Sequence, residues 1–410
     1  MKRDRRHEEG IGDVDGALGP TADAVDNAGG LSLHPAPPSR VEGNGFSGSE
    51  RARSAATVRT VLVRATKTAL YTSGGLSLLR RVVSSRTTLS VLAYHSVSET
   101  GWYRSGSLAV SPALFERQMA FLARHYRVLT LDEVVDCIER GRPFPPSATA
   151  ITFDDGYLDN FTTALPILVR YGLTATFFVT AGPVALGQRF WVSWLRHAIM
   201  TARDLRGLVT AGLVPRDAMT DDPQRRERIV TGLTALVNRS PRGIQGGPLE
   251  EIAQVLGADG MGSPHAGEML RPEHLCAMVR AGMTIGSHTV SHPNLPSLTA
   301  ADAFAELGES RRLLERIIDG PVRHLAYPGG PDPRRPTFTW DTIGLARRAG
   351  YRSASASAHA PTTLASDPLA LGRYTVSDDD GFAGFVFRLE QGNLERFVRR
   401  SRMVDSAGEP

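Results

Sequence analysis

Two adjacent carboxylates, Asp154 and Asp155, follow an apolar and β-branched run over residues 148–153. That run predicts a buried strand, and Gly156 predicts a turn after the pair. Neighbouring side chains on a strand point to opposite faces, so the carboxylates can take different roles only where the strand gives way to the turn. One can then bind a metal ion while the other accepts a proton. The alternative is an Asp-Gly turn with solvated carboxylates.

Two histidines, His288 and His292, follow a second apolar segment that begins at Met283. A spacing of four residues lets both imidazoles face one way on a single helical turn and share one cation. Asp155 would complete a set of three ligands, which leaves a coordination position open for water and substrate, as catalytic zinc sites require. A histidine pair alone is more often a surface or core feature, so the inference depends on both motifs together.

The two motifs, T-F-D-D-G at residues 152–156 and S-H-x-x-S-H at residues 287–292, resemble those of a known family. They are similar to the first and second motifs of the NodB-type polysaccharide deacetylases, carbohydrate esterase family four. The resemblance extends from about Leu89 to Val376. It implies an α/β fold, a distorted (β/α)7-type barrel, with the site at the C-terminal ends of the strands.

The resemblance also implies a role for each charged residue of the two motifs. Asp155, His288 and His292 would bind a divalent metal ion, and Asp154 would be the general base. Zn²⁺ is the expected ion. One carboxylate and two imidazoles also suit Co²⁺, Ni²⁺ and Fe²⁺, so the sequence leaves the ion open.

A third stretch, Tyr327-Pro328-Gly329, matches the family's third motif. In that motif a backbone N–H after the proline faces the oxyanion, which implies this role for the Gly329 N–H. We also expect Tyr327 and Pro328 to contact the substrate. Ala326 stands where the family usually has an arginine that tunes the base, and the fourth motif's Asp-Trp pair is not recognisable. Arg373 is the candidate that can replace the missing arginine in space, and we count it with the substrate-binding residues.

The fifth motif of the family usually holds a catalytic histidine, which Leu371–Val376 lacks. This loss resembles the branch that includes the poly-N-acetylglucosamine deacetylases of biofilm and exopolysaccharide systems, in which a histidine near the start of the domain supplies the acid. His95 has that place, at the end of a strand predicted over residues 87–97. An imidazole has an ordinary pKa of ~6.5, so it can protonate a departing amine near neutral pH. His359, which is nearest in sequence to the missing motif, is the alternative.

Strand and helix patterns alternate over residues 87–400, which predicts a parallel sheet within one deacetylase domain. The pattern changes over about residues 183–270, where helices rich in arginine and a Gly/Pro-rich tract predict an insertion. Trp191 and Trp194 begin this helical stretch. They can stack on sugar rings or fill a core.

The N-terminal part of the chain has a different composition. Residues 1–55 contain few large apolar side chains, which predicts a disordered tail. Residues 56–86 predict a basic amphipathic helix that can lie on an anionic membrane or pack against the next domain. No secretory signal precedes it, and the uncharged stretch over residues 68–79 is too short to span a bilayer. We therefore expect a cytoplasmic protein, with peripheral contact to the inner membrane through residues 56–86.

Charge gives little indication of a nucleic-acid partner. The 410 residues include 47 Lys and Arg against 43 Asp and Glu, for a formal net charge of +4. Basic residues form no patch interleaved with aromatic ones, so we predict no nucleic-acid binding. The expected partner is an acetylated glycan.

Three functions remain open from the sequence. The first is a metal-dependent hydrolase that removes N-acetyl or O-acetyl groups from a polysaccharide or its precursor. The second is a non-catalytic glycan-binding or scaffold protein, since the arginine, the Asp-Trp pair and the fifth-motif histidine are missing. The third is an esterase or small-amide hydrolase on the same scaffold. Asp154 together with all three ligands favours an enzyme, because a scaffold needs neither.

Overall fold

The structure is a computed structural model that describes residues 86–99, 108–216, 222–240, 247–257, 268–329, 336–356 and 359–406, together with residues 69 and 73. The predicted tail of residues 1–55 and nearly all of the predicted helix 56–86 lie outside these ranges, so both stay predictions. Within the described ranges, no helix combines the length and apolar character needed to cross a bilayer.

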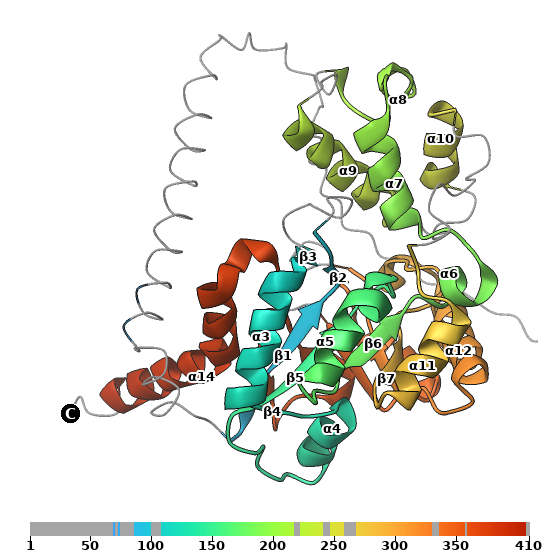
Figure 1. Ribbon diagram of the computed structural model, residues 1–410. Coiled ribbons are helices and arrows are strands. Elements are labelled where there is room, and N and C mark those ends of the chain that lie inside the picture. The colour runs from blue at the N-terminus through green and yellow to red at the C-terminus, as the bar shows by residue number, and fades with distance from the viewer. Residues whose placement is uncertain are drawn as a thin grey trace, which may run out of the picture. The chain divides into compact units, whose positions relative to one another are not determined.

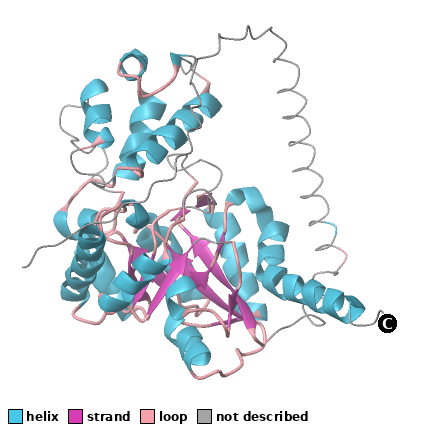
Figure 2. Ribbon diagram, turned by 180° about the vertical axis from the view of Figure 1, so that it is seen from behind, coloured by secondary structure: helices cyan, strands magenta, loops and turns pink. Residues whose placement is uncertain are grey.

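A mixed sheet lies at the centre of the molecule, with helices around it (Figure 1, Figure 2). Its strands run in the order β10 (Thr362–Thr363), β1 (Thr88–Tyr94), β5 (Ala148–Phe153), β6 (Thr176–Val179), β7 (Thr284–Ser287), β8 (His324–Ala326), β9 (Ser353–Ala356) and β11 (Leu371–Gly372). β10 pairs antiparallel with β1, whereas β1, β5, β6, β7, β8, β9 and β11 pair in parallel.

The last strands bring the two ends of this sheet together. β11 pairs with β9, and β12 (Tyr374–Thr375) pairs with β1, so the short segment between residues 371 and 375 bridges from one end of the sheet to the other. The sheet is therefore a nearly closed barrel, which confirms the predicted (β/α)7-type fold. Arg373 separates β11 from β12, within the segment that lacks the fifth-motif histidine.

The central strand β5 has the predicted bounds. Its residues are apolar or β-branched and are buried on both faces from Thr149 onward, as strands of a parallel sheet are when helices cover them. β4 (Arg127–Val128) pairs with its start. The strand therefore ends inside the barrel mouth, directly before Asp154.

Helices follow most of the strands and pack around the barrel. They are α3 (Pro112–His125), α4 (Leu131–Glu139), α5 (Leu165–Arg170), α6 (Ala181–Leu186), α11 (Pro272–Arg280), α12 (Ala300–Ile318), α13 (Trp340–Arg348) and α14 (Gly381–Ser406). A capping box begins α4: Thr130 Oγ1 accepts from the Glu133 N–H and the Glu133 carboxylate accepts from the Thr130 N–H. A π-helical turn, Asn160–Ala164, precedes α5.

Four helices lie together beyond the strand ends toward which β1 points in Figure 1. They are α7 (Trp191–Thr201), α8 (Arg206–Thr210), α9 (Pro223–Val237) and α10 (Pro248–Val255), and all fall within the predicted insertion. Their buried apolar side chains form a separate core, in which Trp191 is 2% and Trp194 is 7% exposed. Trp194 therefore fills this core, which is the packing alternative, while Trp191 packs in the core and also lines the cavity described below.

Candidate active site

The acid pair stands at the end of β5 in an unusual backbone conformation. Asp155 has a φ of 75° and Gly156 a φ of 89°. A left-handed conformation is rare for a residue with a side chain, so the surrounding structure must hold Asp155 in place. This bend separates the two carboxylates, and both are buried, Asp154 at 2% and Asp155 at 4% exposure.

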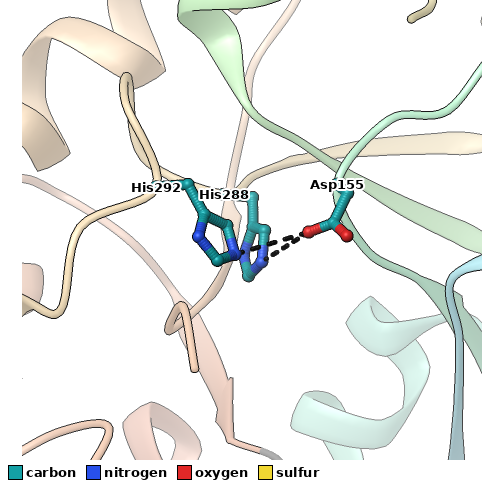
Figure 3. Close-up of side chains that lie close together, drawn as sticks. All are labelled: Asp155, His288 and His292. Carbon is teal, nitrogen blue, oxygen red and sulfur yellow. Dashed lines mark ion pairs between the residues drawn. The ribbon is translucent and has the colours of Figure 1, made fainter. Parts of the chain in front are cut away.

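Asp155 faces the two histidines that the sequence predicts as its co-ligands (Figure 3). The Nε2 atoms of His288 and His292 each lie 3.4 Å from Asp155 Oδ1. That oxygen is buried and has no hydrogen-bond partner. Burial opposes ionisation of Asp155, but the neighbouring imidazoles outweigh it and hold its pKa well below its ordinary value. One carboxylate and two imidazoles converging on one point fit the predicted divalent metal ion.

The tautomer of His288 is set by a backbone contact. Its Nδ1 lies 2.8 Å from the carbonyl oxygen of Ala326, at the end of β8. A carbonyl can only accept, so Nδ1 carries the proton and Nε2 keeps its lone pair on the side of Asp155. Such contacts fix the orientation of metal-binding imidazoles. The residue that replaces the expected arginine thus positions a ligand through its backbone.

The loop between the two histidines is not the helical turn that their spacing suggests. Thr289 and His292 have φ values of 66° and 59°, and the histidines approach each other across an irregular loop after β7. Glu306 on α12 holds this loop. Its carboxylate accepts from the N–H of Val290 at 2.8 Å, the N–H of Ser291 at 2.9 Å and the Ser291 hydroxyl at 2.5 Å. The two histidines therefore do not lie on one helical turn, which corrects that expectation, and Glu306 holds the irregular loop instead.

Asp154 is paired with Arg373 at the seam of the barrel. Arg373 Nη1 and Nη2 donate to the two carboxylate oxygens at 2.7 and 2.8 Å, and the arginine is 0% exposed. This forked geometry is specific to a guanidinium. Burial opposes ionisation of Asp154, but Arg373, followed by His288, lowers its pKa below the ordinary value. Arg373 lies where an arginine that tunes the base is needed. It is not among the residues that line the cavity described below, and its assignment to substrate binding stays a prediction.

The three residues of the third motif have different surroundings, since two are buried in the core and one lines the cavity. Tyr327 is fully buried, its hydroxyl donates to the Leu369 carbonyl at 3.0 Å, and Pro328 is buried beside it. Neither residue is among those that line the cavity described below, and their assignment to substrate binding stays a prediction. Gly329 does line the cavity, with a φ of 118° that other residues rarely adopt. The oxyanion role of its N–H stays a prediction.

His95 follows β1 and lies beside the acid pair. Its Nε2 is 3.9 Å from Asp154 Oδ2, while the preceding Tyr94 turns into the core and donates to Gln118. Burial lowers the pKa of His95, and the carboxylates of Asp155 and Asp154 oppose this effect. Asn160, in the π-helical turn, donates to the His95 carbonyl at 2.7 Å and so holds its backbone.

His359, the alternative acid, lies in the same cavity but has different partners. Its Nδ1 is 3.1 Å from Nη1 of Arg388, whose guanidinium also pairs with Asp380 at 3.0 Å. Burial lowers the pKa of His359, and the Arg388 cation adds to that effect. Because the guanidinium can only donate, His359 Nδ1 is the acceptor and Nε2 carries the proton.

A cavity of about 440 Å³ unites these groups. The site residues that line it are Asp154, Asp155, His288, His292, His95, His359 and Gly329. Glu306, Asn160 and Arg388 support or extend the site but were not singled out from the sequence. The sequence shows Glu306 as a carboxylate next to the apolar stripe of α12, and this is the one local signal that could have marked it for a role in the site. No local signal distinguishes Arg388 from the other arginines.

Comparison with known proteins indicates the class of protein. The family model described as polysaccharide deacetylase matches residues 141–198 and 251–354. YxkH of Bacillus subtilis (strain 168), which is named as a polysaccharide deacetylase, is 22% identical over 300 residues, covering 73% of this chain and 74% of that protein. The Streptococcus pyogenes deacetylase PplD, solved in complex with acetate, has a TM-score of 0.50 at 19% identity, over 75% of this chain and 100% of PplD. IcaB from Ammonifex degensii has a TM-score of 0.46 at 18% identity, over 74% and 97% of the two chains.

The residues matched by the family model include both carboxylates, both histidines and Gly329, and the barrel has the fold of PplD. The chain therefore belongs to the NodB-type polysaccharide deacetylase family. It is an enzyme, a hydrolase of the polysaccharide deacetylase class. Among known proteins, YxkH and PplD are two to which it is similar.

Proposed function

We propose that the enzyme is a metal-dependent hydrolase that removes N-acetyl groups, or O-acetyl groups, from a glycan or its precursor. The observation that carries this proposal is the division of the acid pair. Asp155 faces two imidazoles at 3.4 Å each, while Asp154 is held by Arg373 beside the same cavity. One carboxylate is thus available as a ligand and the other as a base.

Asp155, His288 and His292 would hold the metal ion. When bound, a divalent cation polarises an acetyl carbonyl and makes a water molecule more acidic. Zn²⁺ is the expected ion, with Co²⁺, Ni²⁺ and Fe²⁺ as alternatives. The Ala326 carbonyl keeps the Nε2 lone pair of His288 directed at the site, and Glu306 fixes the loop that carries His292.

Asp154 accepts the proton of the attacking water. The Arg373 fork keeps this carboxylate ionised and fixes its plane, so the base is charged and oriented before the substrate arrives. The Gly329 N–H donates to the oxyanion of the tetrahedral intermediate. His95, across from Asp154, gives a proton to the departing amine.

The absence of a fifth-motif histidine and the place of His95 support a position in the poly-N-acetylglucosamine branch of the family. On this view N-acetylated amino sugars are the preferred substrates. The same geometry can release acetate from an ester, whose leaving alcohol needs less help from an acid than an amine does.

Acetate release from chito-oligosaccharides, acetylated xylan and simple acetyl esters tests the proposal. The metal-loaded protein should release acetate from the amide substrates, and Asp154→Asn should not. Release from simple esters alone would indicate a small-ester hydrolase. No release from any substrate by a folded, metal-loaded protein would contradict a catalytic function.

For localisation we propose the cytoplasm, with peripheral membrane contact through residues 56–86. The support comes from the sequence, in the basic residues and helical spacing of that segment. Fractionation of cells that express the native protein tests it, and recovery from the periplasm or medium would contradict it.

A further inference from the structure

The helical insertion contacts the metal-ligand loop directly. The indole N–H of Trp191, at the start of α7, donates to the carbonyl of Ser291 at 3.1 Å and lies 3.4 Å from that of His292. The Phe190 ring packs edge-on to the His292 imidazole with centroids 5.4 Å apart. These contacts anchor the insertion at the site, and its separate core keeps its helices together.

One wall of the cavity is formed by this insertion. Trp191 and Val192 on α7, and Thr234 and Asn238 on and just after α9, line it together with the metal-binding residues. Thr234 and Asn238 are four residues apart, so they present a hydroxyl and an amide on the same face of the helix. The insertion therefore supplies an apolar surface next to the metal site and hydrogen-bonding groups that line the same cavity.

A second group of lining residues comes from the C-terminal part of the chain. Arg388 on α14 donates to Asp380 and to His359 Nδ1, and all three residues line the cavity. The Arg388 side chain is 21% exposed and the Asp380 side chain 11%. Since the pair is internally neutralised, this wall offers fixed donors and acceptors, suited to sugar hydroxyls, and no net charge.

The two walls limit what can enter. A volume of about 440 Å³ is near the lower end of the ~300–1,000 Å³ of small-molecule pockets. An interior segment of a long polysaccharide needs a groove that continues on both sides of the reacting sugar, whereas side chains of α7, of α9 and of Arg388 line this cavity together with the metal-binding residues. The apolar and hydroxyl-binding surfaces together match one or two sugar rings.

We propose that the insertion restricts this deacetylase to short glycans or chain ends, with the acetylated sugar at the metal site and the neighbouring sugar between Thr234, Asn238 and Arg388. This inference rests on the proposed function and specifies its substrate class. The insertion residues 199–250 lie outside the segments that the family model matches, so the restriction belongs to this chain and not to the family pattern.

Acetate release along two length series tests the inference, one of chito-oligosaccharides and one of acetylated xylo-oligosaccharides, each from one to six sugars. In the series that the enzyme accepts, kcat/KM should reach its maximum at one or two sugars and rise no further. A steady rise to six sugars would overturn the inference while leaving the proposed function intact. No acetate from either series would mean that the proposed function itself fails.

A matched pair of variants on α9 makes the test specific. Thr234→Trp fills the outer part of the cavity, and Thr231→Trp adds the same side chain on the exposed face of the same helix. Thr234→Trp should lower kcat/KM for the disaccharide about tenfold more than for a simple acetyl ester, and Thr231→Trp should not discriminate. If Thr234→Trp does not fold, Asn238→Ala should raise KM for the disaccharide more than for the ester. Equal effects on both substrates would contradict the assigned wall.

Discussion

The floor of the cavity and its rim come from different parts of the chain. The floor, which we define as Asp154, Asp155, His288 and His292, lies within the segments matched by the family model. The rim, which we define as Thr234, Asn238, Asp380 and Arg388, lies outside them. The floor residues follow barrel strands whose register the buried sheet fixes, whereas the rim residues stand on an insertion and a C-terminal segment.

This difference assigns the catalytic reaction to the floor and the choice of substrate to the rim. The barrel places the proposed base and the three proposed ligands after β5 and β7, and their positions do not depend on the rim residues. The insertion and Arg388 decide which acetylated sugar can approach them. Changes to the floor should therefore reduce the rate on every substrate, while changes to the rim should affect large substrates more than small ones.

Asp154→Asn should abolish most turnover and spare the metal. The amide is nearly isosteric but cannot accept the water's proton, and general base catalysis contributes typically ~10²–10⁴-fold. We expect a loss in that range on glycan and ester alike, measured as kcat with metal content as the control. Activity within a few-fold of the wild type would contradict the role of Asp154.

Arg373→Met should destabilise the fold by about 3–5 kcal/mol, because it leaves the buried Asp154 carboxylate without its cation. Urea unfolding measures the loss. Asp154 contributes stability above its ordinary pKa near ~3.9, and that contribution is lost as the pH falls through its lowered folded pKa, so the two proteins should converge in acid.

Arg352→Met is the matched control for Arg373→Met. Arg352 bonds to Asp132 and Glu139 but is 29% exposed, so solvent screens these pairs and the loss should be smaller. An equal loss of unfolding free energy in both variants would contradict the claim that burial makes the Arg373–Asp154 pair more costly to break than an exposed pair.

His95→Ala should lower kcat on amide substrates on the order of 10²-fold, because the leaving amine loses its proton donor. On acetyl esters the loss should be smaller, since an alcohol leaves more readily. His359→Ala, which changes the residue next to Arg388, should lower kcat on the same amide substrates less than about tenfold. The reverse ranking would move the acid role to His359 and remove the support for the poly-N-acetylglucosamine branch.

Glu306→Gln should weaken metal binding about 10- to 100-fold without touching a ligand, because the loop of His292 loses its charged acceptor. Titration with Zn²⁺ measures the change. Glu309→Gln, on the exposed face of the same helix, is the control and should bind Zn²⁺ as the wild type does. Unchanged affinity in Glu306→Gln would mean that the loop holds its shape without this contact.

The sequence predicted the parts of the site that local pattern determines. The β-branched run of residues 148–153 became β5, and its end placed Asp154 and Asp155 at the barrel mouth. The S-H-x-x-S-H motif likewise lies at the end of the apolar segment that begins at Met283, which forms β7. In both cases a buried strand of fixed direction carries the polar residues to the same edge of the sheet.

Contacts between distant segments could not be read in this way. The shape of the histidine loop depends on Glu306. Thr289 and His292 have a left-handed backbone conformation, which a sequence usually indicates by a glycine, and neither is a glycine. The contact between Trp191 and Ser291 joins residues 100 positions apart. Arg373 lies between β11 and β12, where the two ends of the sheet meet, and this brings it next to Asp154. Its contact with Asp154 can therefore be inferred only when the strand order is known.

Metal analysis of the purified protein tests the central claim most directly. The wild type, Asp154→Asn and His359→Ala should each retain a divalent ion, because none of these changes removes a proposed ligand although both altered residues line the cavity. Asp155→Ala, His288→Ala and His292→Ala should each lose it. Full occupancy in all three of these variants would contradict the site.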